Sequence, residues 1–315
     1  MAISRAPLPQ LNGCDFLTDS GLETTLVFLE DRPLPAFAAF PLLDHDEGRR
    51  WLKAYYDRHL QIAADSGVGF IIETPTWRSN PDWGTELGYD AVALDRINMD
   101  AVALCREVRA EWAGRVDPIL LSGQIGPRGD GYQAGRMSPG EAAAYHRPQI
   151  AAFAQAGADL VTAFTLSTIE EAAGITAAAR AAGIPVAISF TVETDGRLAS
   201  GPDLGHAIIE VDRLTGGGPD YFMVNCAHPA HFRHRLDGNP AWAARIRGIR
   251  ANASMQSHAE LDNATILDDG DPADLGARYR DLRTLLPNLS VLGGCCGTDH
   301  RHVAAIAAAC LTPAG

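Results

Sequence analysis

The sequence predicts a single (β/α)8 barrel over residues 1–315, with a short irregular segment at residues 1–13. Three observations favour this fold. Eight short aliphatic runs alternate with longer segments of helical periodicity, and no low-complexity linker or change in composition divides them. The residues with the richest chemistry directly follow the aliphatic runs, as they do at the C-terminal mouth of such a barrel. A doubly wound open sheet is the alternative architecture.

The predicted elements alternate as strand and helix along the chain. Short runs of aliphatic residues predict strands at residues 14–19, 68–73, 118–123, 158–164, 184–191, 221–226, 248–253 and 289–292. Apolar residues at helical spacing predict helices at residues 47–66, 91–113, 139–156, 168–182, 206–214, 242–247, 272–286 and 300–310. Residues 22–40 are rich in proline and are expected to be irregular, and the seventh strand is the weakest of the eight.

Composition limits the partners of the protein. A net charge of −13 argues against nucleic acid, whose phosphates require a basic face. The N-terminus does not resemble a signal peptide, and no stretch approaches the ~20 apolar residues of a membrane span. Six cysteines without regular spacing fit a reducing compartment, where thiols serve metals or catalysis. We therefore expect a cytoplasmic protein with no nucleic-acid and no membrane partner; its oligomeric state is not indicated by the sequence.

Two adjacent cysteines stand out near the end of the chain. Cys295 and Cys296 follow the eighth predicted strand and are flanked by Gly293, Gly294 and Gly297. Side chains of neighbouring strand residues point to opposite faces, so both thiols reach one point only if the backbone kinks, which glycine permits. A metal ion is the natural common target. The alternatives are two inert buried thiols or a strained disulfide between the neighbours.

A third sulfur is expected at the same place. Cys226 ends the sixth predicted strand, so in a closed barrel its thiol faces the same mouth as the adjacent pair. Zinc prefers soft ligands in tetrahedral geometry, and three protein ligands with one exchangeable position are typical of a catalytic site. His228 is an alternative fourth ligand that would close the site. Cys14, Cys105 and Cys310 are expected to be packing residues.

The predicted ligands Cys226, Cys295 and Cys296 also suggest the chemistry. Zinc drives the deprotonation of a bound thiol, and three thiolate ligands leave that sulfur nucleophilic. Hydrolytic zinc usually has less donating ligands, which keep it Lewis-acidic toward water. Thiol alkylation is therefore the better fit. A zinc hydrolase on the same barrel, with His228 or Glu193 as its general base, is the alternative.

Together these residues resemble the homocysteine S-methyltransferase family. The resemblance covers residues 15–308 in consistent order, and its motifs are residues 19–21, 74–77 with Asn80, 123–127, 145–148, 188–191, 225–226 and 293–298. It implies a zinc-bearing (β/α)8 barrel that moves a methyl group from a small-molecule donor, a sulfonium, betaine or methylfolate, to homocysteine and so makes methionine. Cys226, Cys295 and Cys296 would be the zinc ligands.

The resemblance also implies a substrate pocket. The residues expected to bind substrate are Asp19, Ser20, Gly21, Thr74, Trp77 and Asn225. Two positions depart from the family pattern. Ser20 replaces a glycine in the turn after the first strand. Phe164 replaces a glutamate that holds the substrate ammonium in the family.

The absent glutamate matters because a buried ammonium without a carboxylate partner is costly. Either Glu23, Glu73 or Glu193 replaces it from another loop, or the acceptor is a thiol without a standard α-amino group. A third alternative is a family member that binds zinc or thiols without catalysis.

The methyl donor is expected to be a sulfonium. The self-contained members of the family, which use S-methylmethionine or S-adenosylmethionine, are closest in layout to this chain. Aromatic residues in the predicted mouth loops could form a cage for such a cation, namely Trp77, Trp83, Tyr89 and Tyr132. Alternatively, these side chains anchor their loops on the helices.

Overall fold

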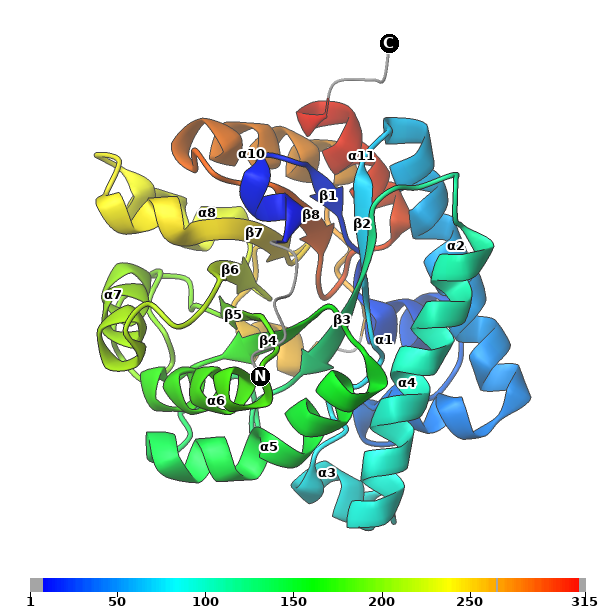
Figure 1. Ribbon diagram of the computed structural model, residues 1–315. Helices are drawn as coiled ribbons and strands as arrows, with labels where there is room; N and C mark the ends of the chain where they lie inside the picture. Colours follow the sequence, from blue (N-terminus) through cyan, green and yellow to red (C-terminus); the bar gives the residue numbers. More distant parts are fainter. Residues whose placement is uncertain (1–7, 265, 312–315) are drawn as a thin grey trace.

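The computed structural model describes residues 8–264 and 266–311, and its centre is a closed barrel of parallel strands (Figure 1). The strands are β1 Phe16–Leu17, β2 Gly69–Glu73, β3 Ile119–Ile125, β4 Leu160–Leu166, β5 Val186–Phe190, β6 Tyr221–Asn225, β7 Ile246–Ala251 and β8 Val291–Gly294. Each pairs with the next, and β8 closes on β1 with Val291 opposite Phe16. The predicted (β/α)8 barrel is confirmed, and the open sheet is wrong because the first and last strands are hydrogen-bonded.

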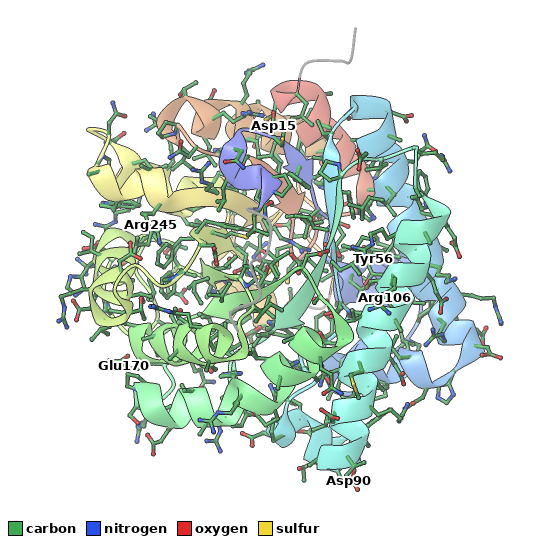
Figure 2. The ribbon with its side chains drawn as sticks, viewed as in Figure 1. Asp15, Tyr56, Asp90, Arg106, Glu170 and Arg245 are labelled. Atoms are coloured by element: carbon green, nitrogen blue, oxygen red, sulfur yellow. A yellow bond between two sulfur atoms is a disulfide. The ribbon has the colours of Figure 1, made fainter. Side chains whose placement is uncertain are left out.

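Long helices surround the barrel (Figure 1). They are α2 Asp46–Ser66, α4 Ala91–Glu111, α5 Pro139–Ala156, α6 Ile169–Ala182, α7 Leu204–Thr215, α10 Pro272–Leu285 and α11 His300–Cys310. Local signals set their ends: Ser138 and Glu141 form a capping box at the start of α5, and Gly157 ends that helix with φ of 80°. Asp90 caps α4 at the edge of the molecule (Figure 2).

Shorter helical segments occupy several connections that the sequence left irregular. Within residues 22–40 they are α1 Leu22–Thr24, the π-helical turn η2 Thr25–Leu29 and η3 Pro35–Phe37, followed by η4 Phe40–Asp44. Later ones are α3 Pro81–Glu86, α8 Pro229–Phe232, η5 Arg233–Leu236 and α9 His258–Asp262. The helix predicted at residues 242–247 is the 3-10 turn η6 Ala241–Arg245. These segments are too short to show a clear apolar period, which is why the sequence did not reveal them.

The core has two parts, as the alternation of strand side chains requires. Side chains such as Phe16, Ile71 and Met223 fill the barrel interior. The larger cluster lies between the strands and the helices. It includes Tyr56 of α2, which is labelled in Figure 2 and donates a hydrogen bond to the Glu73 carbonyl at 2.8 Å. The barrel is therefore filled, and its free space lies at the mouth.

The N-terminal segment closes the opposite end of the barrel. Residues 1–7 lie outside the described part of the chain, but Pro9–Asn12 form the 3-10 helix η1, so the expectation of an irregular segment is wrong for these four residues. Ser290, just before β8, donates to the Gln10 carbonyl at 2.9 Å. This contact places η1 beneath the N-terminal ends of the strands. Across the described residues, no helix has both the length and the apolar character needed to cross a membrane.

Candidate metal and substrate site

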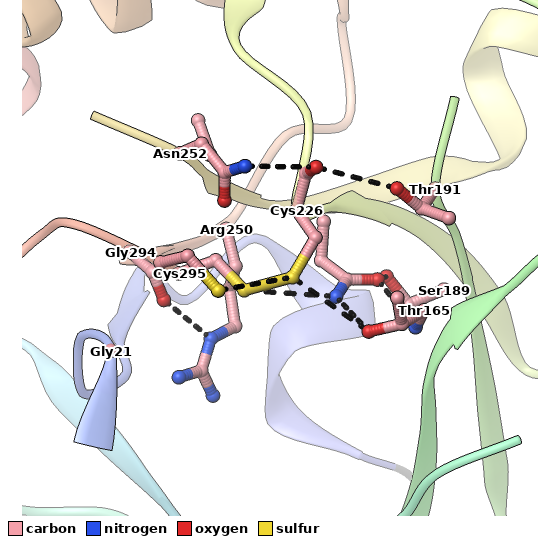
Figure 3. Close-up of a disulfide and its surroundings, with 12 residues drawn as sticks. Gly21, Thr165, Ser189, Thr191, Cys226, Arg250, Asn252, Gly294 and Cys295 are labelled. Carbon is pink, nitrogen blue, oxygen red and sulfur yellow. Dashed lines mark hydrogen bonds between the residues drawn. A yellow bond between two sulfur atoms is a disulfide. The ribbon is translucent and has the colours of Figure 1, made fainter. Parts of the chain in front are cut away.

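Three cysteines meet at the C-terminal mouth of the barrel, and Figure 3 shows two of them, Cys226 and Cys295. Cys226 directly follows β6, and Cys295 and Cys296 directly follow β8. Their three Sγ atoms lie within 4.8 Å of one another. A disulfide joins Cys226 to Cys295, and Cys296 Sγ lies 4.0 Å from Cys226 Sγ. The structure thus brings together sulfurs that are 69 residues apart in the chain.

The disulfide differs from the expected set of three free thiolates, and also from a disulfide between the adjacent cysteines. Because thiolate is the form that binds metals, Cys226 and Cys295 must be reduced before they can act as ligands. Burial raises the pKa of the remaining Cys296 thiol to about 11. A bound cation would offset that effect, since it favours the thiolate.

The donor set fits a metal with one open position. Among the described residues, only the three cysteines form a group of potential metal ligands. His228 does not join them: its Nδ1 accepts a hydrogen bond from the Ala230 amide at 3.2 Å and caps α8. Three soft donors without a fourth are the arrangement in which a ligand can enter the coordination sphere. Of the other cysteines, Cys105 is buried as expected, whereas Cys14 is exposed and therefore not a packing residue.

The glycines that flank Cys295 and Cys296 do not have the expected role of kinking the backbone between the two cysteines. Gly293 and Gly294 belong to β8, and a Cβ on either would collide with a threonine side chain, Thr18 or Thr298. Glycine is needed at both positions because the backbone of β8 lies too close to these threonine side chains to leave room for a Cβ atom. The left-handed backbone occurs at Gly297, with φ of 78°, and across the mouth at Cys226, with φ of 52°.

A hydrogen-bond network holds Cys226 in this strained conformation (Figure 3). Asn225 Oδ1 accepts from the Thr165 amide (2.8 Å) and the Ser189 hydroxyl (2.6 Å), and its Nδ2 donates to Thr165 Oγ1 (2.9 Å). The Cys226 carbonyl accepts from Asn252 Nδ2 at 3.0 Å. Asn225, expected to bind substrate, lines the cavity and also orients a predicted metal ligand.

A buried ion pair fixes the turn after β1. Arg250, in β7, places Nη2 2.8 Å from Asp19 Oδ1 and 2.9 Å from the Ser20 carbonyl. Its Nε donates to the Gly294 carbonyl at 2.9 Å. Asp19 and Arg250 are each 4% exposed. Arg250 therefore ties the predicted substrate turn to the backbone next to Cys295.

Ser20, the departure from the family glycine, anchors that turn to α2. Its hydroxyl lies 2.8 Å from His59 Nε2 and 3.2 Å from the Tyr55 hydroxyl. His59 Nδ1 lies 2.8 Å from the Tyr55 carbonyl, which can only accept, so Nδ1 carries a proton. In the neutral imidazole, which burial favours, Nε2 then accepts from the Ser20 hydroxyl.

Acid should destabilise the fold through His59. Burial lowers the pKa of His59 to about 3, whereas the pKa in an unfolded chain is about 6.5. Between these values the unfolded chain binds a proton that the folded protein does not. The free energy of unfolding therefore falls as the pH falls, by up to about 1.4 kcal/mol per pH unit from this group. We expect His59→Gln to flatten this dependence in urea unfolding between about pH 4 and pH 6.

His234→Gln, at an exposed position, is the matched control and should retain the wild-type dependence on pH. A His59→Gln variant whose unfolding free energy changes with pH as steeply as that of the wild type would contradict the assignment.

A cavity of about 340 Å³ opens at the mouth beside the sulfurs. Its wall includes the three cysteines and the following residues expected to bind substrate: Asp19, Ser20, Gly21, Trp77 and Asn225. Thr74 is fully buried and is not part of the wall. Its hydroxyl accepts from the Gln124 amide at 2.8 Å, and Gln124 does line the cavity.

The aromatic residues divide into two groups. Trp77 and Tyr132 line the cavity together with Phe28 and Phe37, which the sequence did not suggest. Trp83 and Tyr89 lie outside the wall. The Trp83 ring faces the Arg78 guanidinium at 4.0 Å, and the Tyr89 hydroxyl donates to Asp44 at 2.6 Å. The four-residue cage is therefore wrong in composition, although aromatic faces do border the cavity.

Of the three glutamates that could replace the absent family glutamate, only one lines the cavity. Glu193 lies 3.0 Å from His258 Nδ1, and Glu73 is 2% exposed within the barrel; neither lines the cavity. Burial raises the pKa of Glu73 to about 8, so it is neutral near pH 7. Glu23 lines the cavity. Phe164 also lines it, and the Arg250 guanidinium carbon lies 5.0 Å from the centre of its ring.

The sequence did not identify two other residues of this site. Arg250 left one signal: it is the charged residue inside the predicted strand at residues 248–253, and a charged side chain is rarely buried unless paired. His258 lies in α9, lines the cavity, and its Nε2 is 2.6 Å from the Cys226 carbonyl. Nothing in the local sequence marks it, because its partners come from distant segments.

Comparison with known proteins gives consistent matches. The family model described as homocysteine S-methyltransferase matches residues 16–310. The methionine synthases of Mycobacterium tuberculosis and Mycobacterium leprae are 31% and 30% identical to the chain over 145 residues. These alignments cover 40% of this chain and 10% of each relative, so the chain spans only a small part of their length.

Solved structures show the same architecture. The oxidised form of the homocysteine methyltransferase MmuM from Escherichia coli has a TM-score of 0.75 and 20% identity, covering 93% of this chain and 95% of that one. Its metallated form has a TM-score of 0.72 and 19% identity, covering 95% and 98%. At these identities the likeness establishes the fold alone.

Proposed function

We propose that this chain, which belongs to the homocysteine S-methyltransferase family, transfers a methyl group from a sulfonium donor to the sulfur of homocysteine or a related thiol. The observation that carries the proposal is the convergence of Cys226, Cys295 and Cys296 on the wall of the cavity at the barrel mouth. A partly buried group of three thiols is costly to keep as thiolates without a cation, so its chemistry favours a metal.

In the reduced protein, these three cysteines would hold zinc. When bound, the ion lowers the pKa of an acceptor thiol and leaves its sulfur nucleophilic. The residues of the chain fix the positions of the cysteine ligands. Asn225 orients the segment of Cys226, and Arg250 fixes the backbone beside Cys295. Rigid placement of the reacting groups is the main contribution to be expected from the protein in such a transfer.

The transfer itself is a displacement at the methyl carbon. The acceptor sulfur, having lost its proton to solvent, forms a bond to the methyl carbon as the bond from that carbon to the donor sulfur breaks. The electron pair of the broken bond stays on the donor, which leaves as a neutral thioether. No proton has to be delivered to the leaving group, so the site needs no general acid.

The cavity favours S-methylmethionine over S-adenosylmethionine as the donor. Its volume of about 340 Å³ is near the lower end of the range for ligand sites, and it must admit an acceptor as well. Trp77 and Tyr132 offer aromatic faces that attract a sulfonium. A hydrolase is less well supported, because the two expected general bases, His228 and Glu193, do not line the cavity.

The assay uses reduced, zinc-loaded protein with homocysteine and each sulfonium in turn. We expect methionine to form, and to form faster with S-methylmethionine. Preference for S-adenosylmethionine would reverse the donor assignment. Absence of transfer to every thiol in a panel, with zinc content intact, would favour a protein that binds zinc or thiols without catalysis.

A further inference from the structure

The cavity wall carries four carboxylates among the described residues, and they differ in their partners. Asp19 is paired with Arg250. Asp268 accepts hydrogen bonds within its own loop, and Asp262 is exposed to solvent. Glu23 is partly buried, and within residues 8–264 and 266–311 its carboxylate has no hydrogen bond or ion pair to another side chain. Glu23 is thus the partly buried anion of this wall that is left for a ligand.

Glu23 lies on the side of the cavity that holds the sulfurs. It belongs to α1, and residues at both ends of this short helix contact the segment after β8. The Gly21 amide donates to the Thr298 carbonyl at 3.2 Å, and the Gly297 amide donates to Thr24 Oγ1 at 3.3 Å. A Cβ on Gly21 would lie 2.5 Å from the Cys295 carbonyl oxygen. The turn that carries Glu23 is therefore packed directly on the backbone of the cysteines.

The cations nearby are already engaged. Arg250 is neutralised by Asp19. Arg78 donates to the Ala36 carbonyl and stacks on Trp83, and it makes no ion pair with Glu23. Burial raises the pKa of Glu23 to about 7, with the charge of Asp19 adding to the effect. Such a desolvated carboxylate would be stabilised in its charged form by a cationic ligand group.

The residues around Glu23 indicate which cationic group of a ligand it would bind. Phe164 supplies no charge, and neither Glu73 nor Glu193 reaches the cavity. We propose that Glu23 binds the α-ammonium group of the thiol acceptor, so that the acceptor is an amino-acid thiol and Glu23 determines this specificity. The inference rests on the proposed thiol methyltransferase function. It assigns a role to a partly buried carboxyl group of α1 that has no side-chain partner among the described residues.

The test compares two acceptors that differ only in the ammonium group, homocysteine and 4-mercaptobutyrate. Their binding to the reduced, zinc-loaded protein is measured by calorimetry, without a donor. Glu23→Gln should weaken homocysteine binding by about 10- to 100-fold, the effect of losing one hydrogen bond between charged groups. Binding of 4-mercaptobutyrate should change by less than about twofold. Because Glu23 has no side-chain partner, the variant should keep the wild-type melting temperature.

Asp262→Asn is the matched control, since it removes an equal charge from the same wall at an exposed position, and it should leave both affinities unchanged. An equal loss of affinity for the two thiols in Glu23→Gln would overturn the inference. Wild-type protein that binds the two thiols equally would overturn it as well, while the transfer function would stand. Failure to bind either thiol would remove the proposed function itself.

Discussion

Replacing Cys295 with serine is expected to remove bound metal and methyl transfer together. Cys295 is one of only three donors in this group of described residues, so its loss leaves too few ligands for tight binding. Changes to groups that merely orient a ligand already cost about 10- to 100-fold in affinity or activity. We therefore expect activity to fall by more than about 100-fold. Elemental analysis and the methionine assay, both on reduced protein, measure the two losses.

The barrel should survive this change under reducing conditions, because the sulfurs lie at the mouth and the core is filled by other side chains. Circular dichroism and the melting temperature check this point. Cys14→Ser is the matched control, since it removes an exposed thiol at the other end of the barrel. Full zinc content in Cys295→Ser would show that the ligand assignment is wrong.

Replacing Arg250 with methionine should destabilise the protein by roughly 3–5 kcal/mol. The change leaves Asp19 buried without its partner, and it frees the Ser20 and Gly294 carbonyls that Arg250 now binds. Breaking one side of a buried ion pair costs this much because the remaining charge is uncompensated. Urea unfolding of the reduced protein measures the loss as a lower midpoint at an unchanged slope.

Two further variants distinguish the effect of losing the buried ion pair from a nonspecific loss of stability. Arg213→Met removes an exposed arginine paired with Glu210 in α7, and it should leave the urea midpoint close to that of the wild type. Combining Arg250→Met with Asp19→Leu should recover part of the lost stability, because no unpaired charge is then buried. The account would be contradicted if Asp19→Leu destabilised the Arg250→Met variant by as much as it destabilises the wild type.

The sequence predicted the barrel because its signals are local. The helix α5 begins and ends where predicted, at Pro139 and Ala156, since the capping box and the left-handed Gly157 act on the residues beside them. The strands could be counted from their aliphatic runs, and their order follows from the right-handed connections of alternating strands and helices. The short helices after β1 and β6 were not predicted, because packing rather than periodicity forms them.

The candidate site was predictable only in part, for a related reason. The meeting of Cys226 with Cys295 and Cys296 follows from the ends of β6 and β8 lying at one mouth. The sequence could not indicate which two sulfurs are joined, because that depends on how the segments after β6 and β8 meet in space. Nor could it reveal that Arg250 binds Asp19, since β1 and β7 are brought together only by the closed sheet.

X-ray absorption spectroscopy at the zinc edge, on reduced and zinc-loaded protein, tests the central claim most directly. Three cysteine ligands predict three sulfur neighbours at about 2.3 Å and one lighter atom. Adding homocysteine should replace the lighter atom with a fourth sulfur at a similar distance. A zinc ion surrounded mainly by nitrogen or oxygen, or unchanged by homocysteine, would contradict an open three-sulfur site at the barrel mouth.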